Sequence, residues 1–112
     1  MKPDETYPTT HLTTLLDPVI TLAKEAGREI LKVYGSDFAV EHKEDDSPLT
    51  QADLASHHTI VDGLRALTPD AAIISEESGL PGFEERASWR TYWLIDPLDG
   101  TKEFVKRTGE FT

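Results

Sequence analysis

The feature that most constrains the fold is WLIDPLDGTKEF, residues 93–104, where an apolar run passes directly into acidic and turn residues. Residues 92–95 predict a core strand that delivers Asp96 at its end. A second apolar run, AAIIS at residues 71–75, is rich in β-branched residues, predicts a strand covered on both faces and delivers Glu76. The intervening segment is long enough to bring both strands side by side in one sheet. We therefore expect an α/β chain with carboxylates at neighbouring strand ends.

Two helices are expected before this sheet. Apolar residues across 12–34 recur at helical spacing, and Gly35 is placed to end the helix in a left-handed cap. A second helix should begin near Thr50, where TQAD resembles a capping box with Asp53 in place of the usual Glu. Pro69 should end that helix.

The remaining segments are less regular. Residues 38–42 alternate as a short strand, and a charged loop, KEDDSP, follows them. The stretch GLPGFEERASWR reads as a loop with room for one helical turn. The final TGEFT reads as the opening of another strand, so we expect a fragment of a longer domain. Residues 1–10 are expected to form a loose leader, and residues 11–112 the N-terminal part of a single domain.

Composition excludes several classes of function. A formal net charge of -10 disfavours binding to a nucleic-acid backbone, although surplus carboxylates are usually just a solvated surface. The absence of cysteine excludes disulfides, thiolate zinc sites and a cysteine nucleophile. No apolar run approaches the roughly 20 residues of a membrane span, so a cytoplasmic enzyme is the default expectation. The oligomeric state stays open.

The acidic residues at the strand ends have two interpretations. Asp, Pro and Gly are turn residues, so DPLDG could be a turn and nothing more. Magnesium, however, takes one or two carboxylates together with waters and substrate phosphate. Asp96, Asp99 and Glu76 are ligands of that kind, and the neighbouring Thr101 and the SEES sequence favour a site.

The four histidines do not point to zinc. His57 and His58 are adjacent and should diverge on a helix, whereas His11 and His42 lack a partner at zinc spacing. Surface or packing roles are the expectation for all four.

The turn after the strand also suits a phosphate. Gly100 lets the backbone approach an anion, and the first N–H groups of a helical turn over TKEFVKR can hold phosphate oxygens. Lys102, Lys106 and Arg107 could assist, or could be plain surface charge. A phosphoaspartyl mechanism is disfavoured because that chemistry uses DxDGT, with aspartates two apart rather than three. No Walker lysine loop and no EF-hand loop is found.

Taken together, LIDPLDGT and ISEES resemble the inositol monophosphatase superfamily of Mg²⁺-dependent, lithium-sensitive phosphatases. Within it, DGTKEFVKRTGEFT and DDSPLTQADLASH are most similar to the bacterial 3'(2'),5'-bisphosphate nucleotidases. The resemblance implies the N-terminal part of a layered α-β-α-β-α fold. It also implies two or three Mg²⁺ ions, with Li⁺ as an inhibitor.

The resemblance assigns roles to individual residues. The metal ligands would be Glu76, Asp96, Asp99 and the carbonyl of Leu98. Phosphate would sit on Glu76 and on the backbone of Leu98, Asp99, Gly100 and Thr101. Asp53, Glu76 and Thr101 would be catalytic, with Asp53 pairing with Thr101 to deprotonate the attacking water. Without the resemblance, Asp53 reads as a first-turn helix residue. Lys43 and Asp46 match more loosely, and Glu77 reads as a supporting or surface residue.

The implied reaction is hydrolysis of adenosine 3',5'-bisphosphate to AMP and phosphate by a metal-activated water, within sulfur assimilation. Hydrolysis of inositol monophosphate or fructose 1,6-bisphosphate is the alternative. A non-catalytic metal-binding fragment is an alternative of another class, since relatives carry a further metal-binding aspartate in a C-terminal half. On that reading this stretch alone would be inactive. Some relatives associate with the cytoplasmic face of the inner membrane, which stays open here.

Overall fold

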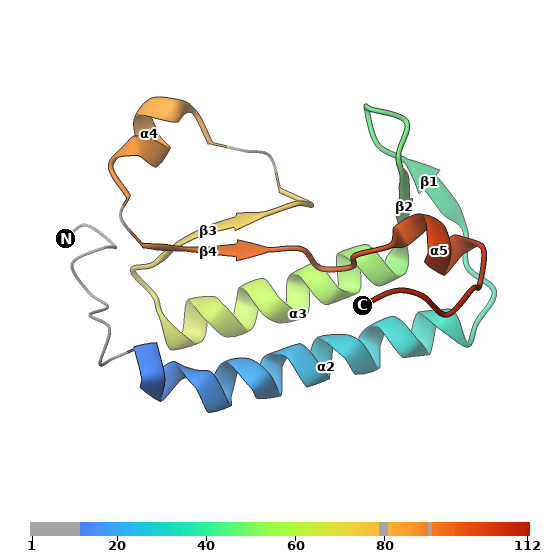
Figure 1. The fold of residues 1–112 in the computed structure, drawn as a ribbon, viewed down its shortest axis with the longest axis horizontal. Helices are drawn as coiled ribbons and strands as arrows, with labels where there is room; N and C mark the ends of the chain where they lie inside the picture. The colour runs from blue at the N-terminus through green and yellow to red at the C-terminus, as the bar shows by residue number, and fades with distance from the viewer. Residues whose placement is uncertain (1–11, 79–80, 90) are drawn as a thin grey trace.

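The computed structural model describes residues 12–78, 81–89 and 91–112. Two long helices lie side by side, and a small parallel sheet lies above the second of them (Figure 1). A hairpin and a short helix stand at the end toward which the strands of that sheet point. The expected leader, residues 1–10, and His11 lie outside the described residues. Within the described residues, no helix combines the length and apolarity needed to cross a membrane.

Both expected helices form. A 3₁₀ turn, η2 (Thr13–Leu15), leads into α2 (Leu16–Tyr34), and α3 (Gln51–Leu67) packs against α2. The capping box predicted at Thr50 is confirmed. The Thr50 side chain accepts a hydrogen bond from the backbone of the first turn, and the Asp53 side chain accepts one from the Thr50 N–H. The left-handed cap predicted at Gly35 is wrong. Its φ is −79°, and its N–H simply continues the helical pattern by donating to Leu31.

The strands meet as two pairs. β3 (Ala72–Ser75) and β4 (Tyr92–Ile95) run parallel with Ser75 opposite Ile95, as the two apolar runs predicted. β1 (Val40–His42) and β2 (Pro48–Thr50) form an antiparallel hairpin, so only the second half of the strand expected over 38–42 is present.

Two short helices complete the described chain. α4 (Phe83–Ala87) is the helical turn expected between the strands, and α5 (Thr101–Val105) follows the DPLDG turn. The strand expected at TGEFT does not form. Residues 108–112 instead run beside the turn, where Asp99 and Thr112 exchange two backbone hydrogen bonds of 2.7 and 3.0 Å.

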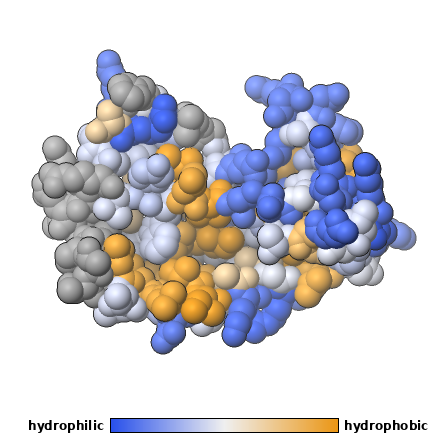
Figure 2. Space-filling view, in the orientation of Figure 1, coloured by the Kyte–Doolittle hydropathy of each residue, from blue (hydrophilic) through white to orange (hydrophobic). Residues whose placement is uncertain are grey.

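The buried residues form two clusters beneath these elements. One joins α2 and α3 to the turn and α5; its members are Ile30, Ala52, Leu98 and Phe104. The other joins α3 to the sheet; its members are Val61, Leu64 and Ile95. Ile74 and Ser75, which point to opposite faces of β3, are both buried, as expected for a strand covered on both faces. In β4, Leu94 lies opposite Ile74 and is 73% exposed, so that strand leaves apolar surface uncovered. Figure 2 shows this apolar surface beside the hydrophilic hairpin and α5.

Arg107 is part of the fold. Its guanidinium donates to the Tyr34 and Ser36 carbonyls at 2.7 and 2.8 Å, which satisfies groups at the end of α2. The same group lies 4.8 Å from the centre of the Phe38 ring. Arg107 therefore has a structural role, and it is not among the residues that line the cavity of the expected site.

We predict that Phe104→Ala lowers the free energy of unfolding by about 3–5 kcal/mol. Phe104 is fully buried and its ring touches those of Tyr34, Phe38 and Phe111, so truncation leaves a cavity among aromatic side chains. Urea denaturation measures the change. Lys106→Ala, two residues on and exposed, is the control and should change stability by less than about 0.5 kcal/mol. Equal effects of the two variants would contradict the prediction.

Candidate functional site

The expected site residues meet at one hollow, a cavity of about 230 Å³ between the hairpin, the sheet tip and α5. The expected residues that line it are Lys43, Glu76, Asp96, Leu98, Asp99, Gly100 and Thr101, joined by Lys102. Asp53 lies beneath and reaches it through Thr101, while Asp46 is not among the lining residues. Lys106 is exposed and also does not line it.

The parallel register places Glu76 and Asp96 next to each other. Each is the first residue after its strand, and the Glu76 N–H donates to the Ile95 carbonyl at 3.0 Å. A hydrogen bond to the Asp96 carboxylate, partial burial and the negative charge of Asp96 together raise the pKa of Glu76 to about 7. Without a cation, Glu76 therefore keeps its proton to a higher pH than an ordinary carboxyl does, beside the Asp96 carboxylate.

The donor set at this pair fits a hard divalent cation. Two carboxylates in contact lack a full counter-charge, and Leu98 lines the same cavity, with its carbonyl 3.4 Å from the Thr101 hydroxyl. In the part of the chain that the structure describes, no three His, Cys, Asp or Glu side chains gather closely enough to hold one ion. The carboxylates in contact are thus a pair, and Asp99 lines the cavity without joining them as a third.

The DPLDG turn is held from below by a residue that the sequence analysis missed. Ser56, on α3 and fully buried, donates to the Pro97 carbonyl at 2.6 Å. Leu98 inserts its side chain into the core beside Ala52 and Phe104. Ser56 lies three residues after Asp53, on the same helical face, and that spacing was the signal available in the sequence.

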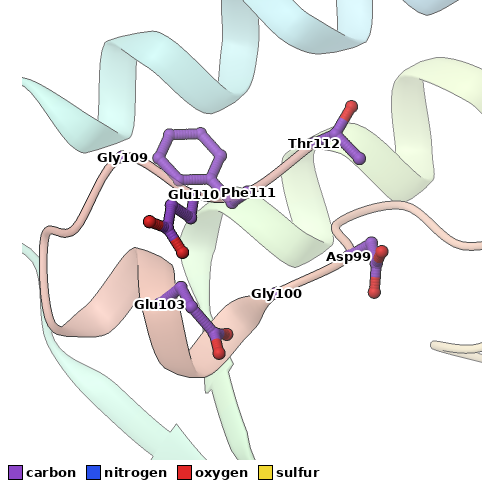
Figure 3. Close-up of a pocket in the computed structure, with 7 residues that line it drawn as sticks. All are labelled: Asp99, Gly100, Glu103, Gly109, Glu110, Phe111 and Thr112. Carbon is purple, nitrogen blue, oxygen red and sulfur yellow. The ribbon is translucent and has the colours of Figure 1, made fainter.

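Gly100 is required by the shape of the turn. Its φ is +87°, and a Cβ there would lie 3.0 Å from the Glu110 carbonyl oxygen. Figure 3 shows residues 109–112 running beside this turn and α5. The hollow drawn there, about 510 Å³, is lined by Asp99, Glu103 and Glu110, and those three carboxylates disfavour an anionic ligand in it.

Asp53 caps α3 and also contacts Thr101. It is fully buried, and its Oδ2 accepts from the Thr50 N–H at 2.9 Å and the Thr50 hydroxyl at 2.8 Å. Its Oδ1 accepts from the Thr101 hydroxyl at 3.0 Å. The helix cap therefore fixes the carboxylate that orients Thr101.

Lys43 bridges the hairpin to the sheet tip. Its Nζ lies 2.9 Å from Oε1 of Glu77, whose side chain is only 4% exposed. Burial lowers the pKa of Lys43, but the hydrogen bond and charge of Glu77 outweigh it, so the net pKa is raised. Glu77 is thus a largely buried ion-pair partner rather than a surface residue.

The described histidines occupy packing or surface positions, as expected, with one correction. His57 Nδ1 lies 2.7 Å from the Ser75 hydroxyl, and burial together with the charge of His58 lowers the pKa of His57. The two rings were expected to diverge, but their centroids lie 5.2 Å apart in an edge-on contact. His42 is exposed in β1.

Comparison with protein families gives a match over almost the whole chain. The model of the inositol monophosphatase family matches residues 11–112. The 3'(2'),5'-bisphosphate nucleotidase CysQ of Escherichia coli K12 is 55% identical over 100 residues. That alignment covers 88% of this chain and 40% of the relative. The CysQ nucleotidase of Aggregatibacter actinomycetemcomitans is 46% identical over 93% of this chain and 38% of its own.

Solved structures give the same result for the fold. The extragenic suppressor protein suhB of Bartonella henselae superimposes with a TM-score of 0.74 at 26% identity, over 88% of this chain and 38% of its own. An IMPase of Thermotoga maritima gives 0.72 at 31% identity, over 86% and 36%. The chain thus spans about two fifths of the length of the proteins that it resembles.

We predict that the Glu76 pair makes the metal-free protein less stable as pH rises. The pKa of Glu76 is about 7 in the folded chain against an ordinary 4.5, so the folded state holds a proton that the unfolded state loses between these values. The stabilisation is complete below about pH 4.5 and is lost as pH rises through about 7. Urea denaturation in EDTA from pH 4.5 to 8 measures it.

The matched control for this prediction is Glu76→Gln, which keeps the shape of the side chain but cannot titrate. The free energy of unfolding of the wild type minus that of the variant should decrease as pH increases. A difference that is constant with pH would show that Glu76 does not keep its proton to a higher pH than an ordinary carboxyl does.

Proposed function

Because the chain belongs to the inositol monophosphatase family, we propose that the cavity of about 230 Å³ between the hairpin, the sheet and α5 is part of the active site of a Mg²⁺-dependent phosphomonoesterase. The observation that carries the proposal is the Thr101–Asp53 hydrogen bond, because Thr101 lines the same cavity as the Glu76–Asp96 pair. A polar relay and a cation-binding pair thus border one cavity. That combination suits the activation of a water for attack on a phosphate.

We propose adenosine 3',5'-bisphosphate as the substrate. Its support is the identity of 55% over 100 residues with a relative named a 3'(2'),5'-bisphosphate nucleotidase. Water would form the new P–O bond, the 3' ester bond would break, and AMP and phosphate would leave. In a cell this step would clear a by-product of sulfate activation.

Glu76, Asp96, Asp99 and the carbonyl of Leu98 would together hold two or three Mg²⁺ ions, with the Glu76–Asp96 pair at one of them. Bound Mg²⁺ lowers the pKa of a coordinated water and neutralises phosphoryl oxygens. The turn would offer its backbone N–H groups at Gly100 and Thr101 to the phosphate, and its shape depends on Gly100, which has a φ of +87°.

Thr101 and Asp53 would move the proton. The Thr101 hydroxyl donates to Asp53, so its lone pairs are free to accept a proton from a water in the cavity. The Asp53 carboxylate is fixed in orientation, because the hydroxyl and the N–H of Thr50 both donate to its other oxygen. The relay is therefore oriented before substrate binds.

We predict that Thr101→Val in the full-length protein lowers kcat by about 10²–10⁴-fold, because it removes the proton acceptor while keeping the side-chain volume. Thr101→Ser, which keeps the hydroxyl, should retain most of the activity. Phosphate release from adenosine 3',5'-bisphosphate with Mg²⁺ measures both. Similar rates for the valine and serine variants would rule out the relay.

We also predict that Asp96→Asn abolishes phosphate release and leaves the protein folded, because the substitution weakens metal binding but preserves shape. Circular dichroism and a urea midpoint check the fold. Full activity of this variant would refute the proposed metal site.

The substrate is tested separately. Rates on adenosine 3',5'-bisphosphate, inositol 1-phosphate and fructose 1,6-bisphosphate, measured side by side in the full-length protein, should favour the nucleotide by kcat/KM. Preference for inositol 1-phosphate or fructose 1,6-bisphosphate would still support a phosphatase site but would overturn the nucleotide as the substrate. Mg²⁺ binding without release from any of the three would favour a non-catalytic metal-binding role.

A further inference from the structure

The turn of the β1–β2 hairpin, residues 43–47, is shaped by its own hydrogen bonds. The Lys43 N–H donates to the Ser47 carbonyl at 2.8 Å, and the Asp46 N–H donates to the Lys43 carbonyl at 2.9 Å. Asp45 accepts from both the N–H and the hydroxyl of Ser47. The turn is therefore a defined unit whose position depends on what holds it from outside.

Its base is anchored, whereas its tip has one polar attachment. β2 packs beside α5 and runs directly into the capped start of α3. Among the described residues, the hydrogen bond from Lys43 to Glu77 is the one that links residues 43–47 to another element. In Figure 1 the hairpin stands apart from the β3–β4 sheet. The bond from Lys43 to Glu77 joins the turn of the hairpin to the residues that follow β3.

The partner of Lys43 lies in a second turn, residues 75–78. The Ser78 N–H donates to the Ser75 carbonyl at 3.0 Å, which closes this turn around Glu76 and Glu77. The Glu77 side chain is 4% exposed and that of Lys43 25% exposed, so the pair is poorly screened by water. An exposed pair such as Glu29–Lys32, at 39% and 71%, lacks this property.

We infer that the Lys43–Glu77 ion pair is a latch that fixes the hairpin turn over the Glu76–Asp96 carboxylates before any ligand binds. Lys43 thereby forms a wall of the same cavity that Glu76, Asp96 and Thr101 line. Both latch residues are positioning residues: Glu77 acts through Lys43 on the hairpin, and neither needs to touch substrate. The consequence for catalysis rests on the proposed function, but the closure of the turn does not.

The latch is tested first without metal or substrate. Hydrogen exchange of the Lys43 and Asp46 amides is measured in the full-length protein in EDTA. Lys43→Met and Glu77→Gln should each speed this exchange roughly tenfold, and the double variant, which leaves no buried charge unpaired, should exchange no faster than either single variant. Lys32→Met, which removes the exposed pair, is the matched control and should leave it unchanged. Unchanged exchange in the latch variants would overturn the inference.

A second measurement distinguishes a latch from a direct phosphate contact. With Mg²⁺ and adenosine 3',5'-bisphosphate, each single variant should raise KM and the half-saturating Mg²⁺ concentration roughly tenfold and leave kcat within about threefold. Lys43→Met should then add nothing in the Glu77→Gln background. A full additional loss in that background would show that Lys43 acts on the substrate itself and would overturn the positioning role. If the wild type releases no phosphate, the proposed function fails, and the exchange experiment still decides the latch.

Discussion

The parallel register of β3 and β4 is the constraint on which the site depends. Pairing Ser75 with Ile95 makes Glu76 and Asp96 the first residues beyond the sheet on adjacent strands. A slip of one residue would turn one carboxylate to the other face, because side chains alternate along a strand. The register is held by apolar packing, since Ile95 lies in the cluster with Val61 and Leu64 on α3. The hydrophobic core thus sets the distance between two charges that repel each other.

At the DPLDG turn, residues that stabilise the fold also position the groups of the proposed active site. Asp53 caps α3 through one oxygen and orients Thr101 through the other. Ser56 on the same helix holds the Pro97 carbonyl, and Leu98 anchors the turn in the core. Substitutions on this face of α3 would therefore alter stability and the site together, which is why variants that keep side-chain shape are needed to separate the two.

The sequence predicted what local patterns determine. The two helices, the capping box at Thr50 and the two strand ends followed from periodicity and turn chemistry and are confirmed. Some errors were local, such as the left-handed cap at Gly35 and the divergence of His57 and His58. Others concern contacts between distant residues. Arg107 reads as surface charge until the carbonyls of Tyr34 and Ser36, more than 70 positions away, accept its protons. Glu77 is likewise buried only because the hairpin supplies Lys43, 34 positions earlier. No local pattern encodes such partners.

The charge around the cavity explains why a cation is the natural complement of this site. Lys43 is already paired with Glu77, so it supplies only part of the positive charge that Glu76 and Asp96 lack. The raised pKa of Glu76 is the physical sign of that deficit, because a proton takes the place of a counter-ion. A proton neutralises one carboxylate, whereas a divalent ion can neutralise both and still attract a phosphate. The fold holds this unfavourable pair in place with its core, whereas a chain free to relax would separate the two carboxylates.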